Sequence, residues 1–546
     1  FRQEGWSYHL EKPEGPLTYN GVVYNEMKGA FSSPDDVLAR DIMNSLFPDI
    51  TYGCESGGDP DNIPELSYEE FLEFHRTYYH PSNSYIYLYG NMDMAAKLDF
   101  IDRNYLSAFD SLYVDSEIRE QQPFDKMHDL VMEYPVAESE SEENNSYLAY
   151  SVVTGTAMDT LKCTAFDILD YALLSTPGAP LKKALLDAGI GSDVYGSYED
   201  GIRQTYFDVV AKGADPGRKE EFVSIIRKVL TDTVENGIDP KALEAGINYM
   251  EFRYREADFS SYPKGLIYGL DILDNWLYDD EHPFAQVQLI PVFDKLKELK
   301  NQGYFEDLIQ RYLLDNPHGS VLTLNPSRGL TARKAKALED KLDAYLSSLS
   351  EEEKTELVKN TANLEQYQEA PEDPEAAKCI PMLIRKEITP FTNEALDIDG
   401  SLFLYHEVPT NGIGYLDLMF DLKDLADEKI PYLGLLKSVL GYVDTAHYTY
   451  GELTNEINAQ TGGIMCGVEV FDHADSVDAF RAFFSVRGKA MYPKTDVLFK
   501  MIREIINTSS LKDTKRLHEI IAQVKSRAQS SLVSAGHSTA VLRAAS

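Results

Sequence analysis

The feature that most constrains the fold is an order of segments that occurs twice, about 270 residues apart. In each copy an apolar helix is followed by a short loop, an amphipathic helix, a glycine-bearing turn and a strand. Residues 168–174 correspond to residues 435–440, and the glycine turn at 189–191 corresponds to 462–464. This offset predicts a duplicated α/β unit, because it is far longer than the period of a solenoid. Chance similarity between two α/β patterns is the alternative.

Local signals place further helices and strands between these copies. Ser67 and Glu70 can form a capping box, which predicts that a helix begins there. Residues 85–89 alternate aliphatic side chains with tyrosines, and this alternation predicts a strand. Leucines at helical spacing after residue 331, followed by a second helix start at Ser350, predict a helical hairpin.

These signals predict five regions along the chain. A polar stretch with an acidic run is typical of a connection between domains. The regions are an α/β unit at 1–115, the connection at 116–145, a second α/β unit at 146–330, the hairpin linker at 331–380 and a third α/β unit at 381–546.

The charge balance narrows the classes of partner. The chain has 51 Lys and Arg against 90 Asp and Glu, a formal net charge of −39. Nucleic-acid binding is excluded, because it depends on basic side chains that neutralise phosphates. No apolar run approaches the ~18 residues of a membrane span, so we expect no membrane insertion. A solvated acidic surface and an affinity for basic partners both remain open.

The cysteines indicate the redox environment. Four are present, they are far apart, and no two form a Cys-x-x-Cys pair. This spacing fits neither a zinc ribbon nor a disulfide framework, so a reducing compartment is the simplest interpretation.

No complete catalytic set is encoded in the sequence. Motifs for metalloproteases, nucleotide phosphates, nucleophilic serines and dinucleotides are all absent. His75 and His80 are five residues apart, which turns them about 140° apart on a straight helix, so they do not converge on one metal. We predict structural roles for them and surface or packing roles for His406 and His518.

One segment nevertheless resembles a known family. Residues 21–31, GVVYNEMKGAF, are similar to the segment that carries the distal zinc ligand in presequence proteases, a branch of the pitrilysin/insulinase zinc metallopeptidases. Four more stretches agree with this family in order and spacing: FRQEGW at 1–6, SGGDP at 56–60, IPEL at 63–66 and FHRTYYHPSN at 74–83.

The resemblance implies both a fold and a metal. The fold would be α+β, with repeated domains that are each a mainly antiparallel sheet with helices packed on one face, plus a helical hairpin linker. The other face would be free to line a chamber. In the family two histidines of a His-x-x-Glu-His helix and a later glutamate bind catalytic Zn²⁺, and the glutamate between the histidines is the general base. Glu26 occupies the position of the third ligand.

The sequence also departs from the family's pattern. It contains no His-x-x-Glu-His, so it carries one of three zinc ligands and no catalytic residue. We therefore expect an internal fragment, with residues 1–115 as the C-terminal part of the catalytic domain and 381–546 truncated. We expect the fragment alone to hold no catalytic zinc and to be inactive.

The resemblance implies that the intact protein is a zinc-dependent metalloendopeptidase acting on unfolded peptides inside two closing bowls. A noncatalytic peptide-binding or scaffolding homologue is the alternative. We expect a monomer that binds neither nucleic acid nor membrane, with a preference for basic peptides. A bacterial-type cytoplasm is the expected location, and a mitochondrial matrix or another organelle is the alternative.

Overall fold

The computed structural model describes residues 2–176, 178–380, 382, 384–387, 394–398, 401–473 and 476–545. Phe1, residue 381 at the expected start of the third unit, and Ser546 lie outside the described residues. The chain forms two compact units. Unit 1 comprises Phe1–Lys28, Pro60–Pro64 and Ala332–Gly412, and unit 2 comprises Gly29–Asp59, Glu65–Thr331 and Ile413–Ser546.

A six-stranded sheet organises the larger part of unit 2. The strand order is β3-β8-β4-β7-β5, and the short β6 also pairs with β7. Every pair is antiparallel except β3 with β8. The bounds are β3 His128–Val136, β4 Ser146–Thr156, β5 Asp193–Tyr195, β6 Tyr198–Glu199, β7 Gln204–Ala214 and β8 Gly319–Arg328.

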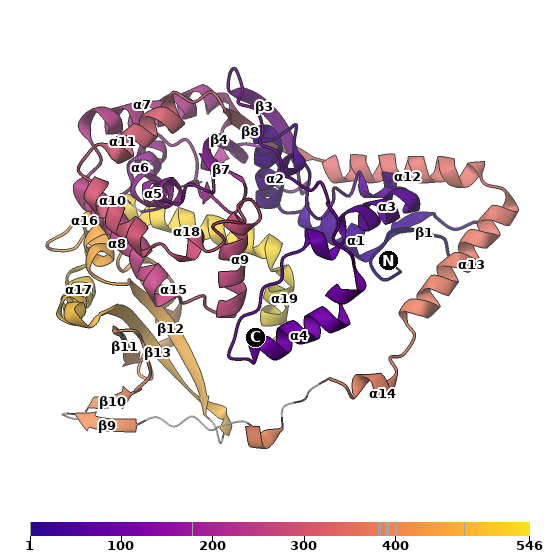
Figure 1. Cartoon of the computed structure of the whole chain (residues 1–546). Helices are drawn as coiled ribbons and strands as arrows, with labels where there is room; N and C mark the ends of the chain where they lie inside the picture. Colours follow the sequence, from indigo (N-terminus) through magenta and orange to yellow (C-terminus); the bar gives the residue numbers. More distant parts are fainter. Residues whose placement is uncertain are drawn as a thin grey trace. The chain divides into compact units, whose positions relative to one another are not determined.

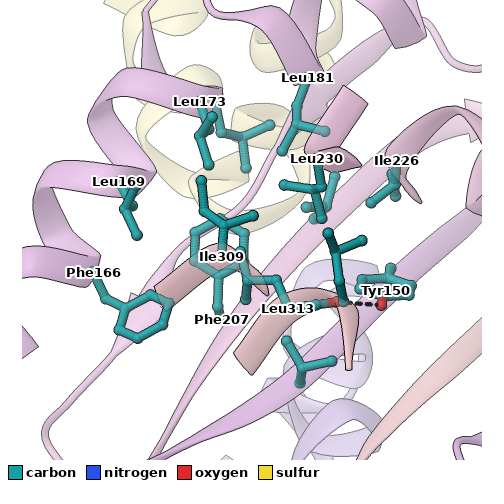
Figure 2. Close-up of a cluster of buried hydrophobic side chains, with 14 of the residues drawn as sticks. Tyr150, Phe166, Leu169, Leu173, Leu181, Phe207, Ile226, Leu230, Ile309 and Leu313 are labelled. Carbon is teal, nitrogen blue, oxygen red and sulfur yellow. Dashed lines mark hydrogen bonds between the residues drawn. The ribbon is translucent and has the colours of Figure 1, made fainter. Parts of the chain in front are cut away.

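Most helices of this region cover one face of the sheet, and their apolar side chains form the largest core (Figure 2). Its centre is the strand residue Tyr150, whose hydroxyl donates to the Leu313 carbonyl at 3.0 Å. Phe166 and Phe207 are also fully buried there. The helices of this region are α5 Thr160–Asp170, α6 Pro180–Asp187, α7 Lys219–Asn236, α8 Pro240–Glu256, α9 Lys264–Trp276, α10 Ile290–Leu299 and α11 Tyr304–Leu308 (Figure 1).

The opposite face of the six-stranded sheet is not free, although the sequence analysis expected it to be. Helix α2, Pro34–Leu46, packs there, with Leu38, Ile42 and Leu46 against Tyr147 and Leu324. The physical reason is visible in β4, where nearly every residue is buried, as expected of a strand covered on both faces.

The predicted duplication is confirmed by strand order. In the first copy, residues 146–256, β7 lies between β4 and β5; in the second copy, residues 413–534, β13 lies between β11 and β12. Both central strands lead through a proline-containing 3-10 turn into two long helices. The second copy contains β11 Ile413–Asp421, α15 Ile430–Val439, α16 Tyr450–Gln460, β12 Ile464–His473, β13 Ser476–Met491, α17 Thr495–Thr508 and α18 Thr514–Ser534; α19 Gly536–Ala545 follows it.

The two copies contact each other through α8 and α16. The carboxylate of Glu256, at the end of α8, is buried and accepts from the Lys489 ammonium at 2.6 and 2.9 Å. The Tyr415 hydroxyl donates to the same carboxylate at 2.7 Å. A charged hydrogen-bond cluster therefore joins the last helix of the first copy to the sheet of the second.

Unit 1 contains the predicted helical hairpin. Its helices are α12, Leu330–Ser348, and α13, Glu351–Gln368, and the Ser350–Glu353 capping box begins the second. The hairpin packs on a two-stranded sheet of β1, Ser7–His9, and β2, Thr18–Asn20. The remaining elements are α1 Val22–Ala30, which continues into unit 2, α14 Pro374–Ala377, and the paired strands β9 Glu394–Ile398 and β10 Ser401–Tyr405.

Two local predictions were wrong. Residues 85–89, predicted as a strand, are irregular, because no described strand lies beside them to pair with their backbone. Tyr87 and Tyr89 instead contact α9, where Gly265 and Gly269 leave room for their rings. Strand β3 was missed, because it lies within the stretch interpreted as a connection.

Two helices flank residues 85–89. They are α3 Tyr68–Tyr78, which begins at the predicted Ser67–Glu70 capping box, and α4 Met94–Asn104. Neither contains a buried residue. Among the described residues, no helix is both long and apolar enough to cross a membrane.

Candidate functional site

The residue singled out by the sequence, Glu26, lies in the middle of α1. The helix follows β2 after a single residue, Gly21. A Cβ at Gly21 would lie 2.8 Å from the Trp6 Cα, so this close approach requires glycine. The Asn20 side-chain oxygen accepts from the Gly21 backbone N–H at 3.0 Å and from the Asn25 amide at 3.3 Å, which fixes the entry into the helix.

Tyr24 anchors α1, and it is the one buried residue of this helix. Its ring meets Tyr19 edge-on at 5.8 Å, and the Lys28 ammonium lies 5.5 Å from the ring centroid. Burial raises the pKa of the Tyr24 hydroxyl, and the neighbouring Tyr19 and Asp61 raise it further. Tyr24 and Glu26 are two residues apart, so the anchoring of one side of the helix leaves the other side accessible.

Glu26 itself is exposed, and it makes no hydrogen bond or ion pair with any residue that the structure describes. A free carboxylate can bind a cation, but catalytic zinc needs three protein ligands. No group of three or more His, Cys, Asp or Glu side chains suited to a metal occurs among the described residues. The described residues therefore do not by themselves fit a catalytic zinc ion.

The histidines have structural surroundings. His75 stacks on Tyr79 with centroids 4.5 Å apart. His80 accepts from the Ser82 backbone N–H at its Nδ1, 3.1 Å away, and so caps a short 3-10 turn. His406 and His518 are exposed.

The sequence analysis missed a set of buried carboxyl groups around the first copy. Burial raises the pKa of Asp208 and of Asp274 to about 7, and that of Asp170 and of Asp200 to about 6. The Asp208 carboxylate accepts from the Ser197 backbone N–H at 2.7 Å. An Asp within an otherwise apolar strand was the available signal for Asp208. Because no metal-type cluster is formed among the described residues, these groups affect stability and are not catalytic candidates.

Comparison with known proteins relates this arrangement to a class. The family described as "Peptidase M16 inactive domain" matches residues 65–250, and the associated domain of the C subfamily of M16 peptidases matches residues 324–546. Protein HypA of Clostridium perfringens is 43% identical over 545 residues, which cover 99% of this chain and 56% of that protein. Presequence protease 1, chloroplastic/mitochondrial, of Arabidopsis thaliana is 33% identical, over 100% of this chain and 51% of that protein.

The chain belongs to the M16 peptidase family, in the branch that includes the presequence proteases. It spans about half the length of the curated relatives it matches. The solved structure of pitrilysin has a TM-score of 0.45 and 14% identity, over 93% of this chain and 52% of that one. The assignment rests on the sequence relatives. It confirms the resemblance carried by residues 21–31 and the α+β fold of repeated domains.

Proposed function

We propose that this chain is part of a zinc-dependent metalloendopeptidase that degrades unfolded peptides in a chamber closed by two bowls. The observation that carries the proposal is the identity of 43% and 33% to HypA and a presequence protease along the whole chain. The chain contributes the end of the catalytic domain (1–115), a connection (116–145), a second peptidase-like domain (146–330), the hairpin linker (331–380) and part of a third domain (381–546).

Glu26 supplies the third zinc ligand in this proposal. Its carboxylate is exposed and lacks a partner among the described residues, so a cation does not have to displace an existing ion pair. Its negative charge would partly neutralise the metal. Zn²⁺, when bound, would polarise a water molecule and the peptide carbonyl. Because the chain carries no partner ligands, Glu26 holds one position of the metal and the chain alone is inactive.

The substrate class is unfolded, extended peptides, bound through the backbone at a sheet edge. The formal charge of −39 supports a preference for basic peptides. The four cysteines are all free, which supports a reducing compartment, a bacterial cytoplasm or an organelle matrix. We propose that the protein acts as a monomer, without nucleic acid or membrane.

A second candidate function is a noncatalytic peptide-binding or scaffolding protein. The match of residues 65–250 to a domain described as inactive favours it. Under this alternative the exposed Glu26 would have no chemical task, and its substitution would leave the protein's properties unchanged.

Substitution of Glu26 in the full-length protein separates the two candidates. Glu26→Gln keeps the volume of the side chain but removes its charge, so zinc affinity and peptide hydrolysis should fall by more than the ~10–100-fold that loss of an outer-shell partner costs. Metal analysis, chelator competition and a fluorogenic peptide assay measure this. Circular dichroism should be unchanged, because Glu26 is exposed.

The matched control is Glu14→Gln, another exposed glutamate of unit 1. It should retain full zinc content and activity. Wild-type activity and zinc in Glu26→Gln would exclude Glu26 as a ligand. Stoichiometric zinc with chelator-sensitive cleavage by the 546-residue chain alone would contradict the proposed division of the site.

A further inference from the structure

We propose that the hairpin helix α12 positions Glu26 through a continuous series of aromatic contacts that runs across β1 and β2 into α1. Tyr345 and Tyr8 are the positioning residues. The inference rests on the proposed function for the role of Glu26 as a ligand, but the mechanical connection itself involves only unit 1.

The first contact joins the hairpin to β1. The Tyr345 ring of α12 stacks on the Tyr8 ring with centroids 4.8 Å apart and planes 18° apart. Leu342 of the same helix is buried against Leu10 and Leu17 beside this pair. Burial, together with Tyr19 and Tyr345, raises the pKa of the Tyr8 hydroxyl to about 12, consistent with close packing of these rings.

The second helix of the hairpin adds a polar contact to the same strand pair. The Leu10 backbone N–H donates to the Thr361 hydroxyl of α13 at 3.1 Å, in a buried position. The residue is just beyond β1, and its donor would otherwise be unpaired in the core. Both hairpin helices thus hold the same end of β1.

The next contacts cross from β1 to α1. Tyr8 and Tyr19 are directly opposite each other in the antiparallel pair, with ring centroids 5.5 Å apart. Trp6 meets both rings edge-on, at 5.5 and 5.4 Å. Tyr19 in turn meets Tyr24, the single buried residue of α1, at 5.8 Å. Two residues beyond Tyr24 lies Glu26.

This series matters because neither β1–β2 nor α1 has much support of its own. A two-stranded sheet is at best marginally stable in water, so β1 and β2 depend on the hairpin helices packed against them. Helix α1 has nine residues, too few for an independently stable helix, and one buried anchor. Loosening of the Tyr345–Tyr8 contact should therefore be transmitted to α1 and to the carboxylate that it carries.

Hydrogen exchange of the 546-residue chain tests the connection without any metal. In Tyr345→Leu, amides of α1 should exchange at least about 10-fold faster than in the wild type. Tyr345→Phe retains the stacked ring and should restore the wild-type rate. Tyr345 is 39% exposed, so its replacement leaves no large buried cavity and the chain should remain folded. Tyr367→Leu is the control, because the ring of Tyr367, on α13, contacts Arg2 and not the strands.

Trp6 provides a second readout of the same contacts. The chain has two tryptophans, so Trp276→Phe leaves Trp6 as the sole fluorophore of this type. In that background, Tyr345→Leu should shift the Trp6 emission to longer wavelength, and Tyr345→Phe should not.

In the full-length protein, Tyr345→Leu should weaken zinc binding at least about 5-fold by chelator competition, and Tyr345→Phe should restore it. Unchanged exchange in α1 overturns the inference and leaves the proposed role of Glu26 standing. Faster exchange with unchanged zinc affinity overturns the positioning of the ligand by the hairpin. Wild-type zinc affinity in Glu26→Gln overturns the proposed function instead, while the exchange result stands on its own.

Discussion

The two copies of the α/β unit share a strand order but not a degree of burial. Leu148 on β4 and Leu418 on β11 hold equivalent places, each opposite a central-strand residue that also faces the third strand. Leu148 is fully buried, whereas Leu418 is half-buried. The difference follows from the neighbours: β4 lies between two strands and under α2, while among described strands β11 pairs only with β13. A shared pattern produces the same topology, and neighbouring elements determine how much of it is buried.

The faces turned away from the main helices differ in the same way. In the first copy this face carries apolar residues beneath α2, with the buried acid Asp208 among them. In the second copy the equivalent face is crossed by an ion ladder, in which Arg487 reaches Asp417 at 2.8 Å and Glu469 at 3.2 Å. Exposed ion pairs of this kind contribute little stability, so the second copy relies on one packed face.

The largest difference is expected from truncation of the equivalent leucines. Leu148→Ala should lower the free energy of unfolding by about 3–5 kcal/mol, because it leaves a cavity in a sheet packed on both faces. Leu418→Ala should cost about 1–2 kcal/mol, since a half-buried leucine loses less apolar contact. Hydrogen exchange under denaturant measures each sheet separately. Equal costs at the two positions would show that the copies are equally packed.

The next effect concerns the charge cluster between the copies. Lys489→Met leaves the buried Glu256 carboxylate without its cation and should cost about 3 kcal/mol. The control is Arg481→Met on the open face, whose exposed pair with Asp421 should be worth about 0–1 kcal/mol. Urea denaturation compares the two variants. A small cost for Lys489→Met would mean that water or another cation replaces the ammonium.

The smallest effect distinguishes the covered faces by pH. Burial raises the pKa of Asp208 to about 7, so the folded protein holds this proton where the unfolded chain has released it. Stability from this group is full below the unfolded-state pKa of about 4 and is lost as the pH rises towards 7. Relative to Asp208→Asn, the wild type should lose about 1.4 kcal/mol per pH unit between pH 5 and 6.5. Denaturation at several pH values measures this, and a constant difference between the two proteins would show that Asp208 is ionised throughout.

Local signals were sufficient for helices whose ends are set within one segment. The Ser67–Glu70 and Ser350–Glu353 capping boxes form as predicted, because each pairs a side chain with a backbone N–H three residues away. The strand at 85–89 failed for the opposite reason: a strand requires a partner that its own sequence does not specify. For Glu26, the sequence supplied the family position, and the structure added that it is exposed and that its helix has a single anchor.

The sequence by itself determined the duplicated order of helices and strands, the hairpin helices and membership of a metallopeptidase family, since each depends on periodicity, capping or matched residues. Only the tertiary structure decided that α2 covers the second face of the six-stranded sheet, that Glu256 joins the two copies, and that the hairpin packs on β1 and β2. These contacts join segments that are up to about 350 residues apart. Periodicity shows that a segment has an apolar face, but the residue that covers this face is chosen by the folding of the whole chain.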